Sequence, residues 1–407
     1  MSNSKAKLNA GGGKRNLLLT ALIAVILSFS LASLVMWATG INPANFFKAL
    51  LQTMTGMNLD KVGEKNFFRP RYIGEFLQTS MPLILAALGV GFANRSGLFN
   101  IGAEGQLIAG IVGADLVALL LPVEGPLLAV CAVLGAALAG SLWAFIPGFL
   151  KAFFGVHEVV STIMFNYMAM HLNNWILTSL PGSSAQRTAD LPKDALLGTD
   201  ALREFTGKSR FHWGFIVVII CLILYQIILQ NSRFGYELRA VGFNKHASEY
   251  AGINSKRRTI ESMLIAGAFC GLGGAMIALG TFNYGRVLTG FENYGFDGLA
   301  VSLLGGNTAI GILLGGLLLG GLKSGQALMQ AMRVPLEIAQ IVSALLILFV
   351  AMQHGIERLI ARFKGGQVKV ATVEESPTIT ETTLPVTEEI KEAVTATDEK
   401  EDEDGTH

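Results

Sequence analysis

Polar residues interrupt a long apolar stretch in the first third of the chain, over residues 94–106. They read Asn-Arg-Ser-Gly-Leu-Phe-Asn-Ile-Gly-Ala-Glu-Gly-Gln and stand between the apolar runs 73–93 and 107–121. Irregular backbone at membrane depth is tolerated only where it is buried in protein or lines a water-filled cavity. Transporters use such broken segments for substrate passage. The sequence therefore predicts a protein that moves a solute across a membrane.

Amide, hydroxyl and carboxyl side chains that could contact this solute occur at three places in the chain. They are Asn100, Glu104 and Gln106 in the interruption, Ser161, Thr162 and Asn166 in a later apolar run, and Asn283 and Asp297 beyond it. Thr162 and Asn166 are four residues apart, so they share one face of a helix. The same residue types also hold helices together inside membranes. Both interpretations stay open at this point, and for Asp297 the second is favoured.

The composition is that of an integral membrane protein. Of 407 residues, 51% are apolar and only 15% are charged, and the mean hydropathy is +0.50, whereas soluble domains carry about 25% charged residues. The three cysteines lie far apart in apolar runs, so they form neither a disulfide framework nor a metal-binding spacing. The composition excludes an ordinary soluble protein.

Apolar segments of about 20 residues are long enough to span a bilayer, and they predict an all-α polytopic membrane protein with eight to ten transmembrane helices. Eight segments are clear, and two (104–121 and 296–306) are shorter or more polar. The clear ones are 17–39, 72–93, 126–150, 158–180, 212–230, 259–281, 308–331 and 336–353.

Basic residues indicate the orientation, because they concentrate in cytoplasmic segments. They cluster before the first span, after the last span and in the connection 231–258. We therefore predict a cytoplasmic segment 1–16 and a permease domain 17–355. Its extracellular loops are expected at about 40–71 and 181–211, and its cytoplasmic loop at 231–258. The tail 371–407 carries twelve acidic residues against two lysines and is predicted to be disordered and cytoplasmic.

The two halves of the chain hint at an inverted repeat. A glycine-containing motif at 97–102 follows a span in the first half, and a similar one at 295–306 follows a span in the second. With five spans in each half, equivalent segments would be inverted, and inverted halves with broken or short helices are typical of transporters. Chance similarity between glycine-rich segments is the alternative.

The motifs of common enzymes and of nucleotide-binding pumps are missing from the sequence. The string Gly320-Gly321-Leu322-Lys323-Ser324 lacks the second glycine of a phosphate-binding loop, and the histidines are scattered. Carboxylates within apolar runs fall mostly near the predicted span ends, which disfavours ion coupling. The energy source for transport is therefore predicted to be a separate subunit.

The basic connection 231–258 is predicted to contain a short helix. Asn244 suits a helix N-cap, residues 247–251 favour about two helical turns, and Gly252 suits the helix end. A plain basic loop that holds anionic lipid is the alternative.

Four strings give this connection a more specific meaning. The string Arg239-Ala-Val-Gly242-x-Asn244, followed by Ala247 and by Ala251-Gly252-Ile253, resembles the coupling-helix loop of bacterial ABC importer permeases of the branched-chain amino acid, ribose and nucleoside group. The other three strings agree with this group and cover, with the first, roughly residues 70–355. They are Gly97-Leu-Phe-Asn-Ile-Gly-Ala-Glu-Gly-Gln106, His157-Glu-Val-Val-Ser-Thr-Ile-Met-Phe-Asn-Tyr167 and Phe296-Asp297-Gly-Leu-Ala-Val301. The string beginning at His157 is similar to purine nucleoside permeases that work with basic-membrane-protein-type binding lipoproteins.

The resemblance implies a pore-forming subunit of an ATP-driven importer, with purine nucleosides such as guanosine as the expected substrates. It also implies three kinds of partner: ABC ATPase subunits that bind ATP and Mg, a second permease (a copy or a paralogue), and an extracellular substrate-binding lipoprotein. The chain itself is expected to be no enzyme and to bind no cofactor, metal or nucleic acid. It would lie in the bilayer of the bacterial cell membrane with both termini in the cytoplasm.

The resemblance also implies which residues contact the ATPase. These are Arg239, Gly242, Asn244, Ala247, Ala251 and Gly252. Amide and hydroxyl groups at the passage positions would match the hydroxyls and ring nitrogens of a nucleoside without a charge. The alternatives are a permease for ribose, other simple sugars or branched-chain amino acids, an ion-coupled transporter that acts alone, and a membrane scaffold without transport.

Overall fold

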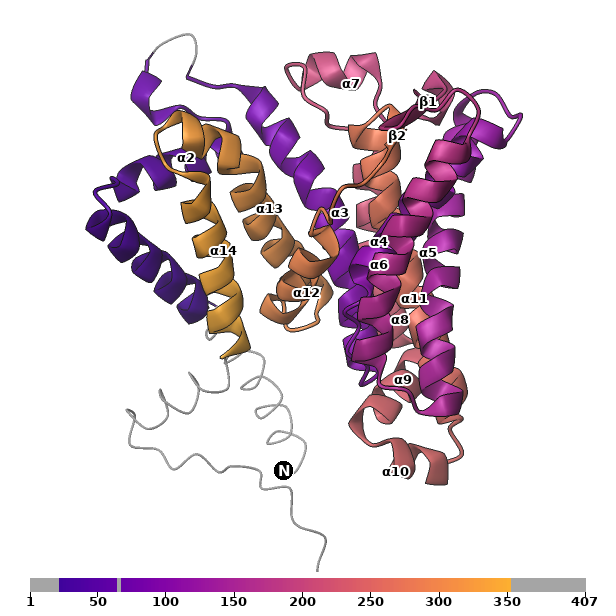
Figure 1. Cartoon of the computed structure of the whole chain (residues 1–407). Coiled ribbons are helices and arrows are strands. Elements are labelled where there is room, and N and C mark those ends of the chain that lie inside the picture. The colour runs from indigo at the N-terminus through magenta and orange to yellow at the C-terminus, as the bar shows by residue number, and fades with distance from the viewer. Residues whose placement is uncertain (1–21, 64–66, 353–407) are drawn as a thin grey trace, which may run out of the picture. The chain divides into compact units, whose positions relative to one another are not determined.

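The computed structural model describes residues 22–63 and 67–352, and nearly all their regular structure is helical (Figure 1). The predictions for the segment 1–16 and for the tail 371–407 lie outside the described residues, as do both ends of the predicted permease domain, 17–21 and 353–355.

All ten predicted apolar segments correspond to helices, which confirms the all-α polytopic fold. Six of these helices are long and apolar enough to span a membrane: α3, α4, α5, α8, α13 and α11 with its continuation. The ten helices are Leu22–Ala38, α3 (Pro70–Arg95), α4 (Ala103–Leu120), α5 (Pro126–Phe154), α6 (Glu158–Ser179), α8 (Gly214–Asn231), α11 (Ser255–Ala275), α12 (Tyr294–Leu304), α13 (Ala309–Ala331) and α14 (Leu336–Ala351). The inverted relation between the halves stays a prediction.

The remaining elements are short and lie in the connections. They are α2 (Pro43–Thr55), η1 (Leu59–Lys61), β1 (Arg187–Asp190), η2 (Lys193–Ala195), α7 (Asp200–Phe205), α9 (Arg233–Phe243), α10 (Lys245–Tyr250), the π-helix η3 (Met276–Thr281) and β2 (Tyr284–Arg286). The strands β1 and β2 pair antiparallel.

One of these elements, α2, lies within the segment that the sequence predicts as an extracellular loop, at about 40–71. Asn42 caps its first turn by accepting from the Ala44 N–H, Pro43 occupies the first helical position, and Gly56 ends the helix in the left-handed conformation. Its face with Phe46 and Ala49 is fully buried, and the helix packs against α3 and α13. The sequence did not reveal α2 because thirteen residues are too few for a span.

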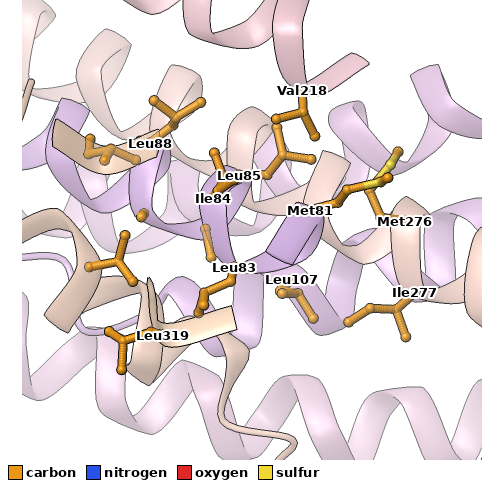
Figure 2. Close-up of a cluster of buried hydrophobic side chains, with 14 of the residues drawn as sticks. Met81, Leu83, Ile84, Leu85, Leu88, Leu107, Val218, Met276, Ile277 and Leu319 are labelled. Atoms are coloured by element: carbon orange, nitrogen blue, oxygen red, sulfur yellow. The ribbon is translucent and has the colours of Figure 1, made fainter. Parts of the chain in front are cut away.

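Helix α3 is the centre of the bundle. It contacts α2, α8, α11, α12 and α13, and its apolar side chains form the core drawn in Figure 2 with residues of α4, α8, η3 and α13. By contrast, most apolar side chains of α5 and α8 are exposed or only partly buried. In a bilayer such faces are suited to lipid or to another subunit.

Small residues bring α4, α5 and α11 into close contact. A Cβ atom added at Gly271 would lie 2.3 Å from the Ala136 carbonyl oxygen, and one added at Gly140 would lie 2.4 Å from the Gly267 carbonyl oxygen. Glycine lets helix backbones approach closely inside membranes. The high glycine content of the chain therefore serves helix packing as well as helix breaks.

Candidate functional site

The predicted interruption is a tight turn between α3 and α4, over residues 96–102. Gly97 has a φ of +78°, which glycine adopts without strain. The Asn100 Oδ1 atom accepts from the Gly102 N–H (3.0 Å), and the amide groups of Asn100 and Gln106 donate to each other (3.0 and 3.1 Å). Both side chains are 1% exposed. Their polar groups therefore shape the turn.

The same turn is attached to α6 by Asn166. Its Oδ1 atom accepts from the Gly105 N–H (2.8 Å), and its Nδ2 atom donates to the Ile101 carbonyl oxygen (3.1 Å). The Ser161 and Thr162 hydroxyls both donate to the Glu158 carbonyl oxygen within α6.

Thr162 lies against the same turn, since a Cβ atom added at Gly102 would be 2.9 Å from the Thr162 Cβ atom. The structure thus brings four of the predicted passage residues together around residues 100–106: Asn100, Gln106, Thr162 and Asn166. The bonds of the three amide side chains favour the helix-holding interpretation. Substrate contact by these residues stays a prediction.

Glu104 joins this first interruption to the start of α12. Its Oε1 atom accepts from the N–H groups of Glu292 (3.0 Å) and Asn293 (2.9 Å), and its Oε2 atom accepts from the Gly295 N–H (2.6 Å). The first N–H groups of a helix have no partner within the helix, and a carboxylate is a strong acceptor for them. Glu104 is fully buried. It therefore links the two halves of the chain.

Asp297 forms an ion pair that the sequence did not indicate. The Lys323 Nζ atom lies 2.8 Å from Asp297 Oδ2 and donates to the Glu292 carbonyl oxygen at 3.0 Å. It also lies 3.9 Å from the centre of the Tyr294 ring. Lys323 belongs to the string that lacks the second glycine of a phosphate-binding loop. In the structure, its ammonium group on α13 instead pairs with Asp297 on α12.

Asn283 lies apart from the other predicted passage residues, near the paired strands. Its carbonyl oxygen accepts from the Leu191 N–H (2.7 Å), and its side chain is exposed. It lines two cavities of about 720 and 780 Å³, which also share Asp200, Arg203 and Tyr284. Each cavity is large enough for a small metabolite.

The predicted helix in the basic connection is confirmed as α10, and α9 precedes it. Asn244 caps α10 by accepting from the Ala247 N–H (3.0 Å), and Gly252 follows with a φ of +82°. Ala247, Ala251 and Gly252 are exposed. Arg239 donates to Gln230 (2.8 Å) at the end of α8. Contact of these residues with an ATPase stays a prediction.

Gly242 is the predicted coupling residue that faces inward. A Cβ atom added there would lie 2.6 Å from the Arg95 carbonyl oxygen and 2.9 Å from the Gly97 nitrogen. Helix α9 thus packs directly on the interruption between α3 and α4.

Arg95 carries this contact further, to the turn between α12 and α13. It donates to the carbonyl oxygens of Asn307 (3.1 Å) and Gly306 (3.0 Å). The Tyr225 hydroxyl also donates to the Asn307 carbonyl oxygen, at 2.9 Å. The sequence reasoning missed Arg95 and Asn307, although a lone arginine at the end of an apolar run is a signal for such a role.

Two exposed aromatic side chains were also missed. Phe243 at the end of α9 and Tyr250 at the end of α10 are each 95% exposed. Exposed aromatic side chains on a short helical corner are typical anchors for a protein partner. Among residues 22–63 and 67–352, no three His, Cys, Asp or Glu side chains are grouped so that they could hold a metal ion.

Comparisons with known proteins agree with this arrangement. The guanosine ABC transporter permease protein NupP of Bacillus subtilis is 43% identical to the chain, over 85% of this chain and 97% of NupP. The nucleoside ABC transporter permease protein NupB of Lactococcus lactis is 36% identical, over 88% and 97%. The glucose ABC transporter permease protein TsgB13 of Haloferax volcanii is 32% identical, over 68% and 74%.

Bacillus subtilis also has a second guanosine ABC transporter permease protein, NupQ, which is 30% identical over 57% of this chain and 74% of NupQ. No solved structure matches the chain significantly. The family model described as branched-chain amino acid transport system / permease component matches residues 72–351. The chain therefore belongs to this family of membrane-spanning transport permeases.

Proposed function

We propose that this chain is the permease subunit of an ABC importer for nucleosides, with purine nucleosides such as guanosine as its substrates. The observation that carries the proposal is the 43% identity to a guanosine permease over 97% of that relative's length. The family model matches residues 72–351, which include the interruption and the α9–α10 corner. The substrate class is therefore inferred from similarity over most of the transport domain, not from a single motif.

ATP binding and hydrolysis belong, in this proposal, to an ATPase subunit that docks on α9 and α10. Phe243 and Tyr250 supply the apolar anchors, and the exposed Ala247 and Ala251 leave room for close contact. The chain needs no cofactor of its own for this role. It is a non-catalytic subunit of the bacterial cell membrane with both termini in the cytoplasm.

Two further partners complete the proposed importer. The second permease is a paralogue, because NupP and NupQ of one bacterium both carry the name of a guanosine permease and both resemble this chain. The extracellular binding lipoprotein would deliver substrate at the end that carries β1, β2 and α7. The two cavities that share Asn283 and Tyr284 open at this end.

The coupling step follows from the packing of α9. The backbone of Gly242 on α9 packs directly against the backbone of Arg95 and Gly97. Movement of the α9–α10 corner therefore displaces these two residues. Arg95 holds the turn at Gly306 and Asn307, so the movement reaches the second half of the chain as well. Alternating exposure of the pathway then needs only two arrangements of this joint.

The proposal is tested by uptake of labelled guanosine, with labelled ribose and glucose in parallel, in cells that lack the chain and in cells that carry it again. We expect guanosine uptake to vanish and to return, while both sugars are unaffected. Dependence of ribose or glucose uptake on the chain, with guanosine indifferent, would replace the nucleoside by a sugar. The 32% identity to a glucose permease makes sugars the second candidate.

A reconstitution distinguishes the importer from an ion-coupled transporter. In proteoliposomes that contain the chain, a second permease, the ATPase and the binding protein, guanosine uptake should require ATP. Uptake by the chain alone under an ion gradient would contradict the proposal.

A further inference from the structure

A stretch that begins with the short strand β2 and continues as irregular chain to Asn293, the N-cap of α12, runs along α4. We call residues 284–293 the extended segment. Near its start, a Cβ atom added at Gly285 would lie 2.6 Å from Asp115 Oδ2. At its end, Glu104 accepts from the Glu292 and Asn293 N–H groups. Glu104 and Asp115 are eleven residues apart on α4, which is about 16 Å along a helix axis. The extended segment thus crosses about half of a hydrocarbon core that is ~30 Å thick.

The extended segment is attached to α6 along the same path. Asn173 donates to the Arg286 carbonyl oxygen (3.1 Å). Asn174 accepts from the Leu288 N–H (2.7 Å) and donates to the Leu288 carbonyl oxygen (2.8 Å). Further along, the rings of Tyr167 and Phe291 meet edge to face with centroids 5.0 Å apart. The segment is therefore a fixed part of the bundle between α4 and α6.

One side of the extended segment has no cover within the described residues. Thr289, Gly290 and Asn293 are exposed. In the part of the chain that the structure describes, Thr289 and Gly290 make no hydrogen bond, and the Asn293 amide side chain makes none. Irregular backbone with free polar groups cannot face lipid, because each unsatisfied group would cost several kcal/mol there. This side must therefore face water, a polar ligand or another subunit, and not lipid.

We propose that the exposed side of the extended segment is a wall of the translocation pathway, and that Thr289, Gly290 and Asn293 bind the hydroxyls of a passing nucleoside. This inference rests on the proposed function and assigns its substrate contact to residues outside the first interruption. Hydroxyls and amides pair with ribose hydroxyls, which both donate and accept. The half-exposed Tyr167 ring beside Phe291 offers an aromatic surface for the base.

Charge on this wall fits an uncharged substrate. Arg286 is paired with Glu292, and Lys323 is paired with Asp297, so neither cation is free to bind a phosphate. Glu104 is fully buried and is used by the three N–H groups it accepts. A nucleoside is therefore favoured over a nucleotide.

Cysteine labelling of the complete importer in proteoliposomes tests the wall. The variants are Thr289→Cys and, as a matched control, Leu138→Cys on α5, whose side chain is 65% exposed on an apolar face. Both are made in a chain whose native cysteines are replaced and which still takes up guanosine. A membrane-impermeant, water-soluble thiol reagent should label Thr289→Cys at least about tenfold faster than Leu138→Cys, since thiols in lipid are not reached by water. Guanosine delivered by the binding protein should slow this labelling.

The inference is overturned if Thr289→Cys is no more reactive than Leu138→Cys, or if guanosine leaves its labelling unchanged. Absence of guanosine uptake by the parent importer would instead overturn the proposed function, so the two failures are distinct. Asn293→Gly supplies the second readout, because glycine keeps the left-handed backbone (φ +64°) and removes only the amide. It should narrow the ratio between the transport rates of guanosine and 2′-deoxyguanosine, and an unchanged ratio would exclude a ribose contact there.

Discussion

The two interruptions of the helical bundle differ in how they use their polar groups. At the turn over 96–102, the side chains of Asn100, of Gln106 on α4 and of Asn166 on α6 bond to one another or to the nearby backbone. In the extended segment, Thr289 and Asn293 leave their side chains exposed. A turn that satisfies itself is suited to hold helices and to transmit movement. A segment with free donors and acceptors is suited to meet a solute. Polar residues in a membrane protein therefore do not mark the pathway by their presence alone.

The largest effect is expected at Glu104, which connects the two interruptions. Glu104→Gln replaces one acceptor oxygen by an NH₂ group, which would face an N–H group of 292–295. Hydrogen bonds to charged groups are each worth about 1.5–3 kcal/mol, so the variant should lose about 3 kcal/mol of stability and most guanosine transport. The measurement is thermal unfolding of the purified complex together with uptake.

Glu75→Gln is the matched control for this change. Glu75 pairs with Arg210, whose side chain is 52% exposed, and exposed pairs contribute less than about 1 kcal/mol. Equal melting temperatures for the two variants would show that the Glu104 bonds do not hold α4 to α12.

A smaller loss of stability and of guanosine uptake is expected for a substitution at Gly242, where α9 contacts the turn over 96–102. Gly242→Ala forces the Arg95 and Gly97 backbone to move, and overpacking of this kind typically costs about 1–3 kcal/mol. Uptake should fall about tenfold while ATP hydrolysis continues, since the contact that transmits the movement is displaced.

Ala247→Val separates this internal contact from ATPase docking. Ala247 is exposed on α10, so valine there meets only the partner. It should weaken binding of the ATPase, measured by co-purification, without altering unfolding of the isolated permease.

Normal uptake by Gly242→Ala would exclude the α9 contact from the coupling mechanism.

These residues also show where sequence reasoning succeeds. The turn at 96–102 and the cap and end of α10 depend on Asn and Gly residues within a few positions of the bonds they make, so local rules identified them. The ten helices that match the predicted apolar segments followed from apolar length alone. The spacing of Thr162 and Asn166 predicted that they share a helix face, and both lie beside residues 102–105.

What the sequence could not supply is the pairing of distant residues. Glu104 bonds to residues 188 to 191 positions later, and Arg95 bonds to residues more than 200 positions later. Lys323 was set aside with a failed motif, although it pairs with Asp297. The extended segment was not recognised either, because its function depends on which sides α4 and α6 cover. Only the packed structure determines that.

A substitution of Asn166 tests whether the side chains around the turn at 96–102 hold helices together, whereas those of the extended segment contact substrate. Asn166→Ala removes the partners of the Gly105 N–H and the Ile101 carbonyl group, at a cost of about 2 kcal/mol. We expect less folded permease in the membrane but an unchanged guanosine rate per molecule, measured by uptake normalised to assembled complex. A normal amount of complex with a lowered rate would instead place Asn166 in the pathway.

The smallest effect on guanosine transport is expected for a change outside the turn at 96–102 and the extended segment, at the corner between α10 and α11. The hydrogen bond that Ser255 donates, and then the nearby Lys245, His246 and Lys256, lower the pKa of the exposed Glu249 carboxyl below its usual 4.5. A lowered folded-state pKa means that ionised Glu249 stabilises this corner above about pH 4.5. That contribution is lost as the pH falls through the folded-state pKa.

Hydrogen exchange of the α10 amides, corrected for intrinsic rates, should therefore show protection that declines below pH 4.5. Ser255→Ala should weaken the decline because the largest cause of the shift is removed. Guanosine transport at neutral pH should be almost unchanged in this variant, since the bond joins the first residue of α11 to α10 and touches neither the turn at 96–102 nor the extended segment. A strong transport defect would mean that the corner controls the interruptions through more than the Gly242 contact.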